Sequence, residues 1–155
     1  MEMLFLPVLL LILFVCRIDA DFQTVEVFGT LNCKGTAFER ATIEIWERDY
    51  FSPNDLLNET KSDISGTFSL SGEEDEALIF FTPYITIEHS CDVPKLDHAY
   101  LNVTGCKRTA QFPIPSGTIG GIYNMSIIDL ETPVTDEVIR CHCRSDIRGI
   151  CRYVL

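Results

Sequence analysis

Cysteine is the residue type in this sequence with the most chemistry to offer. Of seven cysteines, Cys16 lies in an apolar leader, and the rest of the chain holds Cys33, Cys91, Cys106, Cys141, Cys143 and Cys151. An even number in an oxidising compartment predicts disulfides, and six cysteines allow about 15 pairings. We favour Cys91–Cys106, whose short loop is worth roughly 3 kcal/mol in loop-closure entropy. A tail cysteine is then the candidate partner of Cys33, while Cys141 and Cys143 are expected to reach different partners, one of them Cys151.

Metal and catalytic chemistry find little support in the residue pattern. Cys141-His-Cys143 with the distant Cys151 has the composition of a zinc site, but its gaps do not match paired zinc ligands. The acidic run Glu73–Glu76 lacks the spaced pattern of a calcium loop. No Ser–His–Asp or Cys–His pair stands out, and bridged cysteines leave no thiolate nucleophile. We therefore predict no catalytic residue, no metal and no cofactor.

His89 lies two residues before Cys91, on the inward face of a predicted strand. A buried imidazole with a structural hydrogen bond is the favoured interpretation. The alternative is a ligand site or a pH-sensing site beside a disulfide.

Arginine recurs at every fourth position near the C-terminus, at Arg140, Arg144, Arg148 and Arg152. Residues 21–139 hold 7 basic and 20 acidic side chains, a net charge of −13, whereas residues 140–155 hold these four arginines against Asp146. Residues 21–139, the acidic body of the chain, should repel nucleic acid and anionic lipid. We expect an irregular, disulfide-stapled tail that is solvated and folded against the acidic body. The alternative is a tail whose arginines contact an acidic partner, such as a glycosaminoglycan, an anionic lipid headgroup or a receptor.

The N-terminus predicts secretion. The apolar run from Leu4 to Cys16 is too short for the about 20 residues of a membrane span, so a signal peptide cleaved after Ala20 is favoured over an anchor. Three sequons, at Asn58, Asn102 and Asn124, agree with an extracellular protein that carries N-glycans.

The body predicts an all-β sandwich of about seven to eight short strands, because apolar and polar residues alternate between turn signals. The expected inward sets include Val25, Val27, Leu31 and Cys33; Ile43 and Ile45; Phe68 and Leu70; and Ile85, Ile87 and His89. Residues 52–55 are expected to form a turn or a single helical turn, with Leu56 and Leu57 packed behind it.

The ordered motifs resemble the nematode transthyretin-like family. They comprise Val27-Phe-Gly-Thr-Leu-Asn-Cys33, Pro53-Asn-Asp-Leu-Leu57, Gly66-Thr-Phe68, Pro83-Tyr-Ile-Thr-Ile-Glu-His-Ser-Cys91, Cys106-Lys-Arg108 and Ile114-Pro115. The resemblance implies a secreted two-sheet sandwich and divides the chain into a signal peptide (1–20), a transthyretin-like domain (21–131) and a Cys/Arg-rich extension (132–155).

Binding is the predicted function. We expect a non-enzymatic extracellular adaptor or signalling ligand that recognises a cell-surface partner and binds no nucleic acid. The alternatives are a carrier of a small hydrophobic ligand or lipid and, least favoured, a hydrolase. Catalytic relatives of the transthyretin fold end in a Y-R-G-S-type motif, which is absent from Cys151-Arg-Tyr-Val-Leu155; His89, His98 and His142 do not match their spacing either.

Overall fold

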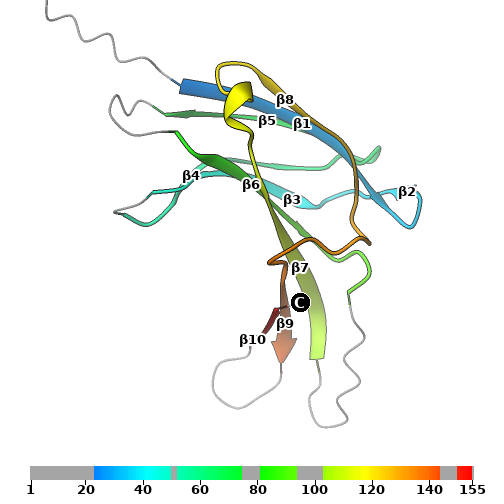
Figure 1. Ribbon diagram of the computed structural model, residues 1–155. Coiled ribbons are helices and arrows are strands. Elements are labelled where there is room, and N and C mark those ends of the chain that lie inside the picture. Colours follow the sequence, from blue (N-terminus) through cyan, green and yellow to red (C-terminus); the bar gives the residue numbers. More distant parts are fainter. Residues whose placement is uncertain (1–22, 50–51, 75–80, 94–102, 144–149, 155) are drawn as a thin grey trace, which may run out of the picture.

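The protein folds into two packed β-sheets (Figure 1), as a computed structural model shows. The structure describes residues 23–49, 52–74, 81–93, 103–143 and 150–154. The predicted disulfide-bonded all-β sandwich is confirmed. Within these ranges, no helix is long and apolar enough to cross a bilayer.

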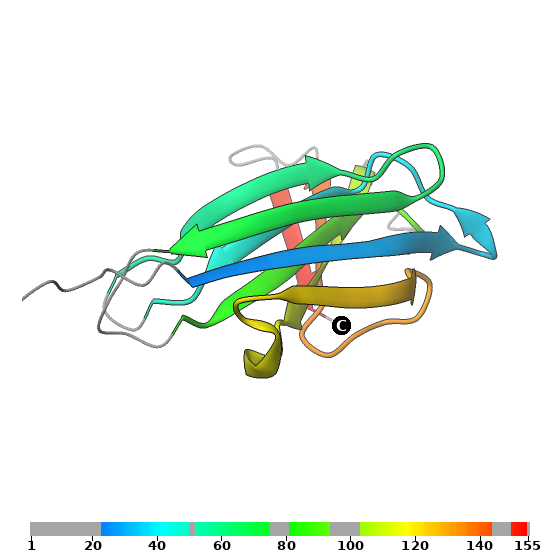
Figure 2. The same ribbon diagram turned by 90° about the horizontal axis from the view of Figure 1, so that it is seen from above.

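The smaller sheet is built around its first strand, β1 (Gln23–Cys33). On one side β1 pairs antiparallel with β5 (Thr67–Glu74) and with the short β2 (Thr36–Ala37). On the other side it pairs parallel with β8 (Ile122–Asp129). Figure 2, seen from above, shows β8, β1 and β5 side by side over the second sheet.

The larger sheet has six strands in the order β10-β9-β7-β6-β3-β4. Their bounds are β3 Thr42–Glu47, β4 Asp55–Lys61, β6 Pro83–His89, β7 Val103–Pro113, β9 Val138–Cys143 and β10 Ile150–Val154. All five pairings are antiparallel. A 3-10 helix, η2 (Ser116–Thr118), follows β7 and leads to β8.

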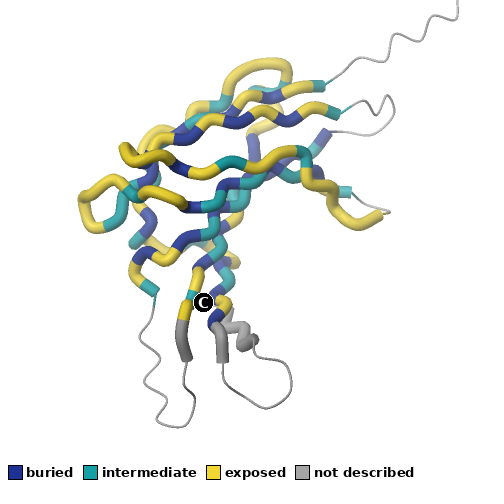
Figure 3. Tube along the Cα trace, turned by 180° about the vertical axis from the view of Figure 1, so that it is seen from behind, coloured by how far each residue is buried: buried dark blue, intermediate teal, exposed yellow. Residues whose placement is uncertain are grey.

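Side chains alternate between the two faces of each strand, and the apolar ones point between the two sheets. The core therefore lies between the sheets, as the buried segments in Figure 3 show. Every predicted inward residue of the four sets is buried except Cys33, which is half-buried; the fully buried ones include Val27, Leu31, Ile43, Ile45, Ile85 and Ile87. Gly66 holds the turn before β5 with φ +77°, where an added Cβ would lie 2.4 Å from the Leu31 carbonyl oxygen. Only glycine fits there without strain.

Two expectations about the strands were wrong. Residues 55–61 form the strand β4, in which Leu56 is exposed, whereas Leu57 packs against the core as expected. Strand β4 lacks alternation because it lies at the sheet edge, where most of its residues face solvent. Residues 138–143 and 150–154 form the paired strands β9 and β10, so this part of the tail is not irregular but continues the larger sheet beside β7.

Candidate binding face and the buried polar cluster

One disulfide joins the two sheets, and it is not the one we favoured. Cys91 bonds Cys33, with an S–S distance of 1.99 Å, so the prediction of Cys91–Cys106 is wrong. Cys33 ends β1 in one sheet, and Cys91 follows β6 in the other. Packing of the sheets therefore brings together two cysteines that are 58 residues apart, which loop length alone disfavoured.

The second disulfide joins β7 to the tail. Cys106 bonds Cys141 across the β7–β9 ladder, where the register shifts between Thr104 and Lys107. Neither bridge connects Cys33 to the tail. The expectation that a tail cysteine bonds Cys33 is therefore wrong as well. The β9–β10 register sets Cys151 opposite Cys141, two residues from Cys143 along β9. A bridge between Cys143 and Cys151 stays a prediction. Cys141 is not available as a zinc ligand, because it is bonded to Cys106.

A buried ion pair lies beside the inter-sheet disulfide. Arg108 Nε and Nη2 donate to the two carboxylate oxygens of Glu137 at 2.8 and 2.7 Å. The side chains are only 3% and 1% exposed, and Arg108 Nη1 also donates to the Cys91 carbonyl oxygen at 3.3 Å. Glu137 comes from the segment expected to be an extension. Sequence reasoning missed this pair, because no spacing rule links residues 29 positions apart.

His89 completes this buried cluster. Its Nε2 lies 3.5 Å from Glu137 Oε1, and its ring meets the Phe38 ring edge-on at 6.2 Å. Burial, together with the Arg108 guanidinium, lowers the pKa of His89 from 6.5 to about 4, against the opposing effect of Glu137. The imidazole is therefore neutral at pH 7 and buried, as the structural interpretation expected. Its Nδ1 has no hydrogen-bond partner in the described part of the chain.

His89 should make folding sensitive to mild acid. Below pH 6.5 the unfolded chain binds a proton that the folded chain accepts only near pH 4, so the free energy of unfolding falls as pH drops through this window. We expect His89 to contribute a loss of up to about 3 kcal/mol. Urea unfolding at pH 4 and pH 7, compared between the wild type and His89→Asn, measures it. Equal losses in both proteins would contradict the assignment.

The outer face of the larger sheet carries a hollow of about 530 Å³. Its polar lining includes Thr42, Thr86, Thr109 and Gln111, and its aromatic lining is Trp46 and Tyr84. Trp46 Nε1 and Thr86 Oγ1 both donate to Glu44 Oε2, at 2.9 and 2.8 Å. These bonds orient the Trp46 ring and the Glu44 carboxylate within the hollow.

Tyr84 is fixed at the same end of the hollow. Its hydroxyl accepts a hydrogen bond from Asn54 Nδ2 at 2.9 Å, and the Arg48 guanidinium carbon lies 5.4 Å from its ring centroid. Further along the face, Thr109 Oγ1 is buried without a hydrogen-bond partner among the described residues. Rigid aromatic rings beside hydroxyl and amide groups are typical of binding sites that recognise polar ligands.

The register positions Lys107, Arg140 and Arg152 form a basic row across β7, β9 and β10, and of these residues Arg140 lines this hollow. Register sets Arg140 opposite Lys107 on β7 and opposite Arg152 on β10. Lys107 forms an ion pair with Glu88, whereas Arg140 is exposed and forms no ion pair with a described residue. Like charges directly opposite one another on a sheet are unfavourable. Arg144 and Arg148 lie outside the described residues.

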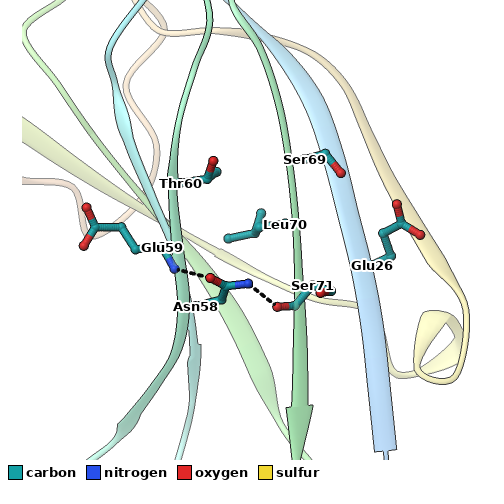
Figure 4. A pocket seen from close by; sticks show the side chains of 7 residues that line it. All are labelled: Glu26, Asn58, Glu59, Thr60, Ser69, Leu70 and Ser71. Atoms are coloured by element: carbon teal, nitrogen blue, oxygen red, sulfur yellow. Dashed lines mark hydrogen bonds between the residues drawn. The ribbon is translucent and has the colours of Figure 1, made fainter.

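A second hollow, of about 440 Å³, lies between β4 and β5 (Figure 4). Its lining combines Glu26 and Glu59 with small polar side chains and has no aromatic ring. The sequon residue Asn58 bridges it: Nδ2 donates to the Ser71 carbonyl oxygen at 2.8 Å, and Oδ1 accepts from the Glu59 N–H at 2.9 Å. We regard it as the weaker binding site because it offers neither a ring nor a cation.

The remaining candidate residues divide by location. Asn124 is exposed on β8, and Glu73 and Glu74 end β5. Asn102 and His98 lie outside the described residues, as do Asp75 and Glu76. Across the described ranges, no three His, Cys, Asp or Glu side chains gather as they would around a metal ion.

Two sheets tied by an inter-sheet disulfide, a buried polar cluster and an open polar-aromatic face define a small disulfide-bonded β-sandwich. The chain belongs to the transthyretin-like family, whose profile matches residues 28–115. Nearly all of the strands up to β7 fall within this match, whereas β8 to β10 follow it.

The curated relatives agree with this membership. The chain is 33% identical over 136 residues to transthyretin-like protein 16 of Caenorhabditis elegans, which covers 86% of this chain and 96% of the relative. It is 34% identical over 117 residues to transthyretin-like protein 46 of the same species, covering 74% and 64%. A 9R-lipoxygenase from Cyanothece aligns over 70% of this chain and 16% of its own length, with a TM-score of 0.41 and 12% identity, which is too remote to support any inference.

Proposed function

We propose that the protein acts outside the cell as a non-enzymatic binding protein, an adaptor or signalling ligand, that recognises a cell-surface partner. The binding surface is the outer face of the larger sheet. The observation that carries the proposal is the hollow of about 530 Å³ in which Trp46 and Tyr84 stand beside hydroxyl and amide groups. Its charged lining consists of one cation, Arg140, and the carboxylates of Glu44, Glu88 and Asp136. The family membership, the apolar leader and the sequons support the extracellular location.

The basic row supports a partner that carries an acidic group. Arg140 lies within the hollow and forms no ion pair with a described side chain. A guanidinium binds a carboxylate, sulfate or phosphate group through two parallel hydrogen bonds. Such a group on the partner would offset the like charge of Lys107, which stands opposite Arg140 in the ladder. Trp46 and the polar residues would then contact the rest of the partner.

Cell-surface binding by the labelled, secreted protein tests this proposal. Trp46→Ala removes the central ring, and we expect a loss of affinity of tenfold or more, since buried aromatic contacts at interfaces are worth about 2 kcal/mol or more. Arg140→Glu should weaken binding and also reduce its dependence on salt, because screened ionic attraction is lost.

Arg40→Glu is the matched control for charge. Arg40 is exposed in the loop before β3 and lies outside the hollow, so this variant changes net charge equally and should bind as the wild type does. Wild-type affinity of Trp46→Ala would exclude this face as the binding surface. Equal weakening by Arg40→Glu and Arg140→Glu would show that only net charge matters.

No observation favours the alternative functions. Carriage of a small hydrophobic ligand needs an apolar cavity, whereas both hollows described above are lined mainly by polar residues. His89 is no accessible base for hydrolysis, because its side chain is buried within an ion-pair cluster.

A further inference from the structure

We propose that Asn124 carries an N-linked glycan whose first sugars cover an apolar patch on the edge strand β8. The inference goes beyond the binding face and shares with the proposed function only the extracellular location. It rests on the shape of β8, the surroundings of Asn124 and the hydrogen bonds of its side-chain amide.

A bulge in β8 turns Asn124 and two isoleucines to the same exposed side. Register sets Asn124 opposite Phe28 and Ile127 opposite Thr30, so the single residue Gly29 faces both Met125 and Ser126. Ser126 has φ +58°, the left-handed conformation that one type of bulge, the G1 bulge, uses. The extra residue restores the alternation: Ile122, Asn124 and Ile127 are exposed, whereas Tyr123, Met125 and Ile128 pack against the core.

The exposed side forms a patch that water solvates poorly. Ile122 and Ile127 are 60% and 69% exposed, and they flank Asn124 along the strand. Phe28 is half-buried on β1 at the position opposite Asn124. Neighbouring strands lie about 4.8 Å apart, so a sugar attached to Asn124 can lie over the Phe28 ring and between the isoleucines.

Strand β8 is also an edge that needs protection. In the described part of the chain it pairs with β1 alone, which leaves its other side open. Edge strands usually carry lysine, proline or inward charges that prevent pairing with a second molecule. Residues 122–129 contain no lysine and no proline, and their one charge, Asp129, lies at the end. A bulky glycan in the middle of the strand would add to the protection that the bulge in β8 supplies.

The side-chain amide of Asn124 is arranged for this modification. Its Oδ1 accepts a hydrogen bond from the Ser126 N–H at 2.8 Å, while its Nδ2, the atom that a glycan joins, makes no hydrogen bond to a described residue. Asn58 differs, because its Nδ2 donates to the Ser71 carbonyl oxygen. Asn124 can therefore project a glycan without the loss of a structural contact.

Glycopeptide mapping of the full chain secreted from eukaryotic cells tests the proposal. We expect a glycan on Asn124, and we expect Asn124→Gln to lose that mass and to shift in size-exclusion chromatography from the monomer towards a dimer or larger species. Asn58→Gln, the matched control, should remain at the monomer position. Ser126→Gly removes the same sequon while glycine adopts φ +58° without strain, so it should show the same shift even if Asn124→Gln folds poorly.

Phe28→Ala tests the contact between sugar and ring. It leaves the sequon intact and should lower Tm more in the glycosylated protein than in the Asn124→Gln background. An unmodified Asn124 in the secreted protein would overturn the proposal, and so would glycan-free variants that stay monomeric. These results do not depend on Trp46 or Arg140, so failure here and failure of the binding face are distinguishable.

Discussion

Replacing Glu137 by glutamine should remove about 3–5 kcal/mol from the free energy of unfolding. The substitution keeps the side-chain volume but leaves the Arg108 guanidinium, only 3% exposed, without its counter-charge. A buried charge that has lost its partner costs this much, whereas the intact pair contributes little net stability. The corresponding fall in Tm is roughly 10 °C or more. Urea and thermal unfolding of the purified protein measure both quantities.

Two further variants isolate the cause. Arg108→Met combined with Glu137→Leu removes both charges, and we expect it to recover most of the lost stability. Asp92→Asn breaks the ion pair with Lys34, whose side chains are 50% and 66% exposed, and should change stability little. A Glu137→Gln protein as stable as the wild type would show that Glu137 does not neutralise Arg108 in solution.

Loss of the Cys33–Cys91 disulfide should cost about 4 kcal/mol. The bridge closes a loop of 58 residues, so its removal frees a large part of the unfolded chain. The double variant Cys33→Ala with Cys91→Ala also loses the covalent tie between the sheets. The free energy of unfolding of this variant under non-reducing conditions, compared with that of the wild type, measures the cost.

Peptide mapping without reduction checks the pairing itself. It should recover one peptide pair that joins Cys33 to Cys91 and another that joins Cys106 to Cys141. The control, Cys106→Ala with Cys141→Ala, opens a shorter loop of 35 residues and should cost slightly less in loop entropy. It should also loosen β9, and with it the position of Glu137. Recovery of a Cys91–Cys106 peptide would refute the inter-sheet bridge.

Residues 132–143 have a structural role in this protein. Glu137 neutralises a buried arginine of β7, Cys141 bonds β7 covalently, and β9 extends the same sheet. Figure 1 shows β9 beside the far half of β7, beyond the strands of the smaller sheet. Truncation at the predicted domain end, residue 131, would therefore expose the Arg108 side chain rather than remove a dispensable tail.

The sequence by itself determined the class of fold and most of the core. Alternating apolar residues identified the inward faces of β1, β3, β5 and β6, because side chains on a strand point to opposite faces with a period of two. His89 was placed inward by the same rule. Strand β4 was missed because an edge strand exposed to solvent needs no apolar face.

Only the tertiary structure decided which distant residues meet. The pairs Cys33–Cys91, Cys106–Cys141 and Arg108–Glu137 depend on which strands become neighbours, and local periodicity carries no information about strand order. The hollow on the outer face likewise gathers Trp46, Tyr84 and Arg140 from three strands that are separate in the sequence. Residue type predicted the kinds of contact this protein makes, whereas sheet topology selected the partners.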